Sequence, residues 1–263
     1  MTLLSTHGLV VSIAGIRICR DLNLQINVGE RWAILGPNGS GKTTLLHTLA
    51  GLRPAQGGDI VLKNRHLNTW RPRDRAKLLG ILLQDYDDPF PSTVKETALI
   101  GRHPHLRRWE IENDNDITQA QYALNMVDLT GYENRAVATL SGGERRRLAI
   151  ATLLTQSPQL FLLDEPTNHL DLFHQIQIMQ LFSQLATQEE RALIMVLHDV
   201  TSTIRYCDHA LLLFGEGETL AGNVNDVITE ENLVRLYGHP IRRLTGPEGD
   251  VWTPSFSGDF RQL

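Results

Sequence analysis

The feature that most constrains this chain is a glycine-rich stretch that follows a short apolar run. Residues 36–43 read Gly-Pro-Asn-Gly-Ser-Gly-Lys-Thr and match the pattern G-x-x-x-x-G-K-[ST]. Residues 32–35 before it are apolar, as expected of a buried parallel strand, and a helical pattern starts at Lys42 and can end at Gly51. Glycines let backbone N–H groups surround phosphate oxygens, the lysine reaches the β and γ oxygens, and the hydroxyl can ligate Mg²⁺. The stretch therefore predicts a triphosphate site rather than an ordinary strand–turn–helix.

A second apolar run delivers two acidic residues that suit the same chemistry. Residues 160–163 are apolar and lead into Asp164 and Glu165. Asp164 at the end of a strand can support the Mg²⁺ shell, and Glu165 can polarise a water for in-line attack on a γ-phosphate. A strand that ends in Asp-Glu usually marks only the point where a chain meets water. The prediction therefore depends on the phosphate loop being present as well.

Strand and helix patterns alternate around these motifs, which favours an α/β fold with a parallel sheet. We expect strands at 9–13, 16–18, 22–26, 32–35, 59–63, 160–163 and 192–197, and a helix at 173–186. Between about 85 and 158 the pattern becomes helical, with residues 113–116 read as a loop before a helix over 117–126. Residues 245–263 are rich in Gly, Pro and Ser and predict a loosely attached tail.

A second phosphate-binding turn is predicted at residues 140–144, which read Leu-Ser-Gly-Gly-Glu. Ser141 and Glu144 form a capping-box pattern that would start a helix over 145–154. Gly142 and Gly143 leave N–H groups exposed at the helix start, so the turn is also an anion site. Because the chain already has one phosphate loop, this second site predicts that a nucleotide is shared between two copies.

Composition argues against several other classes of protein. The 30 acidic residues outnumber the 25 basic ones, so a general attraction to nucleic acid is not expected. Cys19 and Cys207 offer no spaced pair for a disulfide framework or metal site, no apolar run is long enough to span a bilayer, and the first residues lack the pattern of a secretion signal. His103 with His105, and the three arginines 145–147, are interpreted as solvated surface rather than as metal or nucleic-acid sites.

Five stretches in this order resemble the ATP-binding cassette (ABC) ATPases: GPNGSGKT (36–43), LSGGE (140–144), LFLLDEP (160–166), NHLD (168–171) and VLHD (196–199). LSGGE matches the signature that separates that family from other phosphate-loop proteins, and Gln84 stands where the family has its Q-loop glutamine. The resemblance covers roughly residues 3–240. It implies a P-loop NTPase (ABC ATPase) core at 1–85 and 158–240 with an N-terminal antiparallel β subdomain, an inserted α-helical subdomain at about 86–157, and a C-terminal tail at 241–263.

The resemblance also implies a role for each matching residue, with ATP and Mg²⁺ as cofactors. The triphosphate would be bound by Gly36, Pro37, Asn38, Gly39, Ser40, Gly41, Lys42, Thr43 and Thr44. Thr43, Gln84 and Asp164 would hold Mg²⁺. Hydrolysis would use Glu165 as general base, His198 on the γ-phosphate and Gln84 near the attacking water. Ser141, Gly142 and Gly143 would reach the nucleotide of the second copy, and Asp171 would couple the two sites.

One departure from the family concerns the base of the nucleotide. The family stacks adenine on an aromatic residue, and that place falls near Ile13 in this chain. No aromatic residue is nearby. Since stacking on an aromatic side chain is worth about 1–3 kcal/mol, the departure predicts reduced discrimination between ATP and GTP.

Short motifs at 93–94, 101–104 and 232–238 look like those of ATPases from bacterial importers for iron-siderophore, haem or cobalamin. That branch implies a homodimer, transmembrane permease subunits, indirectly a substrate-binding protein, and no nucleic acid. It would lie at the cytoplasmic face of the inner (plasma) membrane, held there by the permease. The alternative is a single-cassette ABC ATPase without a membrane partner, such as the iron–sulfur cluster assembly ATPase. A phosphate-loop kinase would leave LSGGE without a purpose.

Overall fold

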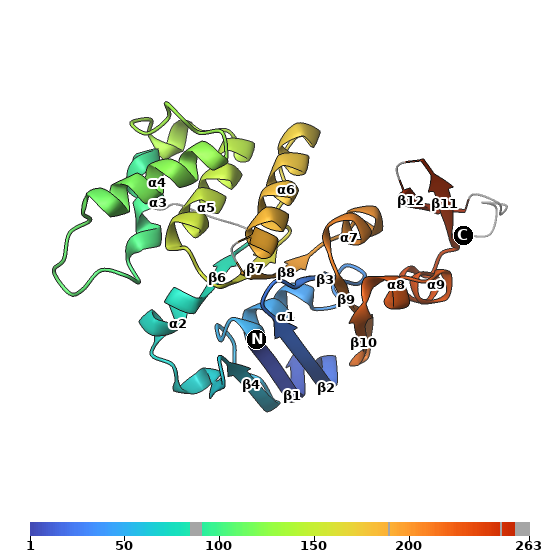
Figure 1. Cartoon of the computed structure of the whole chain (residues 1–263). Coiled ribbons are helices and arrows are strands. Elements are labelled where there is room, and N and C mark those ends of the chain that lie inside the picture. Colours follow the sequence, from blue (N-terminus) through green and yellow to red (C-terminus); the bar gives the residue numbers. More distant parts are fainter. Residues whose placement is uncertain (85–90, 189, 248, 256–263) are drawn as a thin grey trace.

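A six-stranded sheet forms the centre of the molecule in a computed structural model that describes residues 1–84, 91–188, 190–247 and 249–255 (Figure 1). The strand order is β10-β9-β3-β8-β7-β6, with β10 antiparallel to β9 and the other pairs parallel. The bounds are β3 Arg31–Leu35, β6 Leu79–Leu82, β7 Leu160–Asp164, β8 Ala192–Val196, β9 His209–Gly215 and β10 Glu218–Asn223. Because β3, β8, β7 and β6 are parallel neighbours, their carboxyl ends share one edge, where ligands of such sheets bind.

Side chains of the central strands alternate between two separate cores. In β7, Leu160 and Leu162 join the core that contains α1 and the N-terminal strands, whereas Phe161 and Leu163 join the core that contains the long helices. All four side chains have 0 % of their surface exposed. A strand covered on both faces needs apolar residues at every position, which is why 160–163 is a continuous apolar run.

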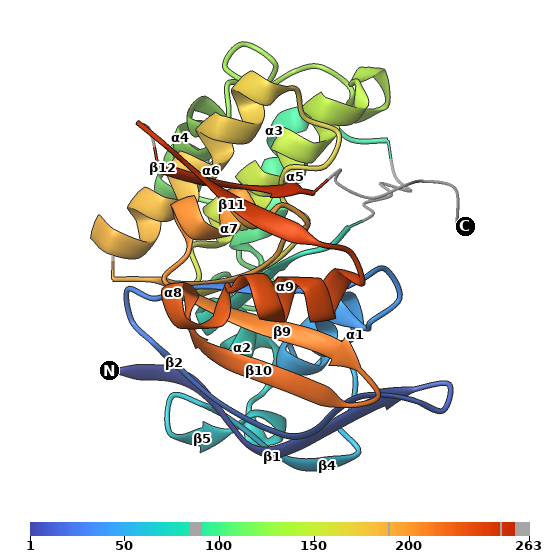
Figure 2. The ribbon, with the colours of Figure 1, turned by 90° about the vertical axis from the view of Figure 1, so that its right-hand side faces the viewer.

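The N-terminal segment forms a separate antiparallel sheet within the described residues, in the order β2-β1-β4-β5. Its bounds are β1 Thr2–Ile13, β2 Ile16–Asn27, β4 Gly57–Leu62 and β5 Arg65–His66. Figure 2 shows this sheet at the opposite end of the molecule from the helices α3, α4 and α5. The expectation of separate strands at 16–18 and 22–26 is wrong, because a bulge between the pairs Val11–Cys19 and Leu9–Leu22 lets one strand continue through two exposed residues.

Helices fill both sides of the central sheet. Their bounds are α1 Lys42–Leu49, α2 Pro72–Leu78, α3 Val94–Leu99, α4 Asp114–Met126, α5 Gly142–Gln156, α6 Leu172–Gln188, α7 Val200–Tyr206, α8 Val224–Val227 and α9 Glu230–Tyr237, with 3₁₀ turns η1 Leu67–Thr69, η2 Ile100–Arg102 and η3 Val137–Thr139. The helices α3, α4 and α5 gather on one side of the sheet (Figure 1). None of the helices in the described ranges combines the length and apolar character that a membrane crossing requires.

Two helices begin earlier than the sequence pattern predicts. Residues 114–116 are the first turn of α4 rather than a loop, because Asn113 Oδ1 accepts from the N–H of Asp116 (3.2 Å) and Asp116 Oδ2 accepts from the N–H of Asn113 (3.1 Å). The carboxylates in this turn also suit the positive end of the helix dipole. Likewise α5 starts at Gly142 and ends at Gln156, so it is longer than the expected 145–154.

The motif at 101–104 is explained by close packing between η2 and α5. A Cβ atom on Gly101 would lie 2.2 Å from the carbonyl oxygen of Thr152, so only glycine fits. The next residue, Arg102, is 8 % exposed, and its Nε donates to Asp116 Oδ1 at 2.7 Å. Burial raises the pKa of Asp116, but the Arg102 guanidinium and the N–H of Asn113 outweigh this effect and lower it. The pair therefore ties η2 to the first turn of α4.

Replacing Asp116 by Asn should lower the free energy of unfolding at pH 7 by about 3 kcal/mol, because it leaves the buried Arg102 without its counter-charge. Since the folded-state pKa of Asp116 is lowered, the ion pair stabilises the protein above the unfolded-state pKa and loses its effect as the pH falls through the folded-state pKa. Urea unfolding from pH 7 down into the acid range should therefore show the difference between the two proteins shrinking. The control Asp114→Asn, at an exposed position, should cost less than about 1 kcal/mol. Equal effects at both positions would contradict the prediction.

The expectation of a loosely attached tail from 245 onward is wrong for residues 245–247 and 249–254. β11 Ile241–Gly246 and β12 Gly249–Pro254 pair as an antiparallel hairpin, and Trp252 packs against the larger core. The hairpin lies across α7 (Figure 2). Glycine and proline here mark a turn and a strand end, which composition alone does not distinguish from a tail. Residues 256–263 lie outside the described part of the chain.

Candidate active site

The phosphate loop connects the end of β3 to the start of α1. Gly41, the N-cap of α1, has φ = 92°, a left-handed conformation that glycine adopts without strain. Lys42 folds back over the loop, and its Nζ donates to the carbonyl oxygens of Gly36 (2.9 Å) and Pro37 (3.0 Å). Burial lowers the pKa of Lys42, and the nearby Glu165 and Asp164 oppose this shift. A triphosphate would supply further negative charge to this buried ammonium group.

Asp164 ends β7 and is completely buried, with 0 % of its surface exposed. Neither carboxylate oxygen has a hydrogen-bond partner of good geometry among the described residues. Burial raises the pKa of Asp164, and the Thr43 hydroxyl opposes this rise even though it is not well directed for a hydrogen bond. A buried carboxylate without a partner is costly unless a cation or donor completes it. Since carboxylate and hydroxyl oxygens suit Mg²⁺, Asp164 and Thr43 fit a magnesium site.

Glu165 is held by side chains from two other segments and by one from its own segment. His198 Nε2 lies 2.5 Å from Oε1, Gln84 Nε2 lies 3.3 Å from Oε2, and the Asn168 amide also donates to Oε2. Partial burial raises the pKa of Glu165, but the hydrogen bonds from His198 and Asn168 outweigh it and lower the pKa. Glu165 is therefore ionised at neutral pH, as a general base must be. The structure brings all three predicted catalytic residues together.

Arg146 is a site residue that the sequence analysis missed. It is 5 % exposed, and its guanidinium donates to the carbonyl oxygens of Leu83 (2.5 Å), Asp164 (2.5 Å) and Glu165 (2.7 Å). The interpretation of 145–147 as a solvated face is therefore wrong for Arg146, and Arg147 is also only 8 % exposed. Helical spacing was the available signal, because 146, 150 and 153 fall on one face and the latter two are apolar and buried.

His105 is a second correction to the predicted solvated surface. It is partly buried, and its Nε2 lies 2.9 Å from the carbonyl oxygen of Gln156. Burial lowers the pKa of this histidine. Its ring therefore packs η2 against the end of α5, whereas His103 is exposed as expected.

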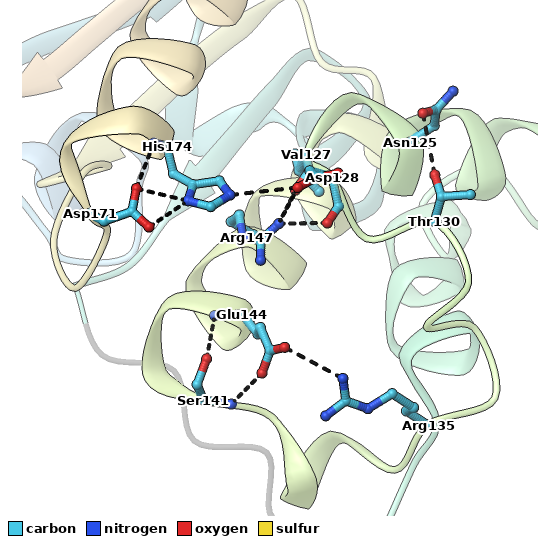
Figure 3. A network of polar contacts seen from close by, with 10 residues as sticks. All are labelled: Asn125, Val127, Asp128, Thr130, Arg135, Ser141, Glu144, Arg147, Asp171 and His174. Atoms are coloured by element: carbon cyan, nitrogen blue, oxygen red, sulfur yellow. Dashed lines mark hydrogen bonds and ion pairs between the residues drawn. The ribbon is translucent and has the colours of Figure 1, made fainter.

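The turn at Ser141 forms the predicted capping box (Figure 3). Ser141 Oγ accepts from the N–H of Glu144 (3.2 Å), and Glu144 Oε2 accepts from the N–H of Ser141 (2.7 Å). The segment before α6 lies against this turn, since a Cβ atom on Gly143 would lie 3.0 Å from the carbonyl oxygen of His169. Among the described residues, no hydrogen bond or ion pair joins the turn to Lys42. Its exposed N–H groups remain available to an anion from elsewhere.

Ile13 ends β1 at the hairpin turn, half-buried and paired with Ile16 on β2. We expect ATP and GTP to bind this chain with affinities within a few-fold of each other. Ile13→Tyr should raise ATP affinity about tenfold, because aromatic stacking adds roughly 1–3 kcal/mol. Competition against a fluorescent ATP analogue measures both, with Ile111→Tyr, an exposed position in the loop before α4, as the control. A strong ATP preference of the unchanged protein would contradict the expectation.

Comparison with known proteins places these observations in a family. The ABC transporter family model matches residues 19–168. The chain is 38 % identical over 236 residues to the petrobactin import ATP-binding protein FpuC of Bacillus anthracis, covering 89 % of this chain and 86 % of that protein. It is 36 % identical over 252 residues to the hemin import ATP-binding protein HmuV of Escherichia coli O157:H7, covering 93 % and 96 %. The chain belongs to the ABC transporter ATP-binding family.

Solved structures of other proteins have the same fold as this ABC ATPase. An inward-facing transporter of metal-chelate type has a chain that superposes with a TM-score of 0.85, at 27 % identity, over 98 % of this chain and 99 % of that chain. The ATP-binding cassette MJ0796, in a dimeric post-hydrolysis state with ADP and Pi, gives a TM-score of 0.74 at 25 % identity, over 84 % and 99 %. The predicted fold class and the predicted family are confirmed. This ABC ATPase binds ATP and hydrolyses it as a subunit of a transporter.

Proposed function

We propose that this ABC ATPase powers the import of a metal chelate such as an iron-siderophore, haem or cobalamin. The observation that carries the proposal is the meeting of Lys42, Asp164, Glu165, His198 and Gln84 at one sheet edge, in a chain whose relatives include petrobactin and hemin import proteins. The alternative function, an iron–sulfur cluster assembly ATPase, is not favoured, because FpuC and HmuV are import ATP-binding proteins.

We propose a role for each site residue, supported by the contacts described above. The loop 36–44 binds the triphosphate, with Lys42 leaving the Gly36 and Pro37 carbonyls to contact the β and γ oxygens. Thr43, Asp164 and Gln84 would hold Mg²⁺, which would screen charge on the phosphates. ATP and its attacking water first displace one of the side chains that contact Glu165. Glu165 then takes a proton from that water. His198 then turns from Glu165 toward the γ-phosphate.

We propose further that two copies share two nucleotides. The exposed Ser141 and Gly142 and the partly buried Gly143 of one copy would contact the γ-phosphate held by the phosphate loop of the other. Asp171 would lie between the two sites. Loss of the γ-phosphate removes a charge from this shared interface, so hydrolysis would open the dimer. The dimeric cassette MJ0796 supports this arrangement.

The division into a core at 1–85 and 158–240 and a helical subdomain at about 86–157 is also proposed here. Its first boundary falls next to residues 85–90, outside the described part of the chain. The subdomain and the Gln84 segment would carry motion to permease subunits, which hold the protein at the cytoplasmic face of the membrane. A substrate-binding protein would deliver the cargo to the permease from the other side.

The test is transport by the complete complex. The chain is co-expressed with the permease genes beside its own, purified, and reconstituted in proteoliposomes loaded with ATP. Uptake of a ferric siderophore, haem or cobalamin that depends on ATP supports the proposal. Capture of soluble assembly factors in place of a multi-spanning membrane protein would overturn it.

A further inference from the structure

A histidine outside the predicted motifs fixes the turn that contains Asp171. Asp171, the residue before α6, accepts a hydrogen bond from the backbone N–H of His174 at 2.9 Å. The ring Nδ1 of the same histidine lies 2.9 Å from both carboxylate oxygens of Asp171 (Figure 3). One residue therefore holds the Asp171 carboxylate through its backbone and its side chain.

The other side of the imidazole faces the segment after α4. His174 Nε2 is buried without a hydrogen-bond partner and lies 3.7 Å from Asp128 Oδ2. Asp128 has φ = 57°, and its carbonyl oxygen accepts from Arg147 Nη1 at 2.6 Å. Arg147 belongs to α5, the helix that Ser141 caps. The contacts Asp171–His174–Asp128–Arg147, here called the His174 bridge, thus run from the turn before α6 to the body of α5 (Figure 3).

The His174 bridge joins two surfaces that the dimer proposal requires to meet a partner at the same time. The two surfaces also meet through their backbones, because the His169 carbonyl lies against Gly143. That approach limits how close the two segments come, whereas the bridge places one ring between a carboxylate of each segment. Asp171 and Asp128 are both exposed, with 66 % and 68 % of their side-chain surface accessible, and Arg147 Nη1 also lies 3.7 Å from Asp128 Oδ2.

We propose that His174 is a positioning residue for ATP hydrolysis. By bridging Asp171 and Asp128 it keeps the Asp171 turn and the Ser141 turn of one copy in a fixed relation, so that both engage the second copy together. This inference rests on the proposed shared-nucleotide dimer. His174 acts through Asp171 and contacts no residue of the phosphate loop among its recorded hydrogen bonds and ion pairs. Binding of ATP to a single copy is therefore independent of it.

The first experiment compares His174→Asn with Asp128→Gly. Asn keeps a donor for Asp171 and is too short to reach Asp128, and Gly removes the Asp128 carboxylate while allowing the positive φ. Each variant should lower kcat by up to about fivefold, the most that one exposed charge contact contributes, with KM for ATP changed less than twofold. The double variant should be no slower than the slower single variant, because both break one bridge. Glu112→Gln, which removes a partly exposed charge before α4, should leave kcat unchanged.

A second experiment separates this inference from the proposed function. In a Glu165→Gln background, ATP and Mg²⁺ should produce a dimer whose dissociation constant, measured by analytical ultracentrifugation, rises about fivefold or more when His174→Asn is added. If Glu165→Gln alone stays monomeric, the proposed function fails. If it dimerises and His174→Asn changes neither the dissociation constant nor kcat, the bridge is overturned while the proposed function stands. Asp128 is largely exposed, so Asp128→Gly gives the answer if His174→Asn folds poorly.

Discussion

Glu165→Gln is expected to lose nearly all turnover while it still binds ATP. The carboxylate at this position is the only described one that contacts both His198 and Gln84, and an amide cannot accept the proton of the attacking water. Loss of a positioned general base typically lowers a rate 10²- to 10⁴-fold, so kcat should fall by about that factor. Glutamine keeps the size of the side chain and can still contact Asn168, so ATP affinity should change little. Phosphate release and equilibrium ATP binding measure the two quantities.

The same variant tests the sharing of nucleotides between copies. With hydrolysis blocked, ATP and Mg²⁺ should hold the protein as a dimer in size-exclusion chromatography. Glu216→Gln, on the exposed turn between β9 and β10, is a matched control that should hydrolyse ATP normally. Normal turnover in Glu165→Gln would remove the assigned base, and a monomer with ATP and Mg²⁺ would remove the shared site.

Arg146→Ala should be among the most destabilising single changes in the chain. It removes the donor for the carbonyl oxygens of Leu83, Asp164 and Glu165, in contacts that are buried at Asp164 and partly buried at the other two. We expect the free energy of unfolding to fall by about 3–5 kcal/mol, measured by urea denaturation. Arg146→Lys should recover only part of this, because an ammonium lacks the planar fork that reaches several carbonyls.

Arg145→Ala provides the comparison for this prediction. Arg145 is exposed, although its guanidinium also donates to the carbonyl oxygens of Leu140 (3.2 Å) and Ala138 (3.0 Å). Water can replace a donor at an exposed carbonyl, so its loss should cost less than about 1 kcal/mol. Similar losses for the two arginines would show that the buried contacts of Arg146 do not stabilise the fold as argued.

The sequence was most informative where one residue type is required by geometry. Gly41 must adopt a left-handed φ, Lys42 must follow it on a helix, and Asp164 must end an apolar strand, so the pattern alone located the phosphate loop and its acidic partner. That Glu165 and His198 would touch was predictable only through the family resemblance, because their strands are neighbours in the sheet and distant in the chain.

Contacts that depend on the position of one helix against another were not predictable. An arginine is usually a surface residue. Arg146 is buried because its guanidinium binds backbone carbonyl oxygens at the ends of β6 and β7. The His174 bridge needs α4, α5 and α6 to meet at one point, which no local pattern specifies. The hairpin at 241–254 was hidden for the opposite reason, since its turn residues are also those of an unstructured tail.

The close packing of Gly101 against α5 makes that helix move as a rigid body. A Cβ atom on Gly101 would lie 2.2 Å from the Thr152 carbonyl oxygen, so the η2 backbone packs directly against α5 at this point. At 1.5 Å per residue, the helix is about 22 Å long. Ser141 caps one end, and at the other end Gln156 donates to the carbonyl oxygens of Ala76 and Leu79. A displacement of the Ser141 turn is therefore transmitted along α5 to α2 and β6.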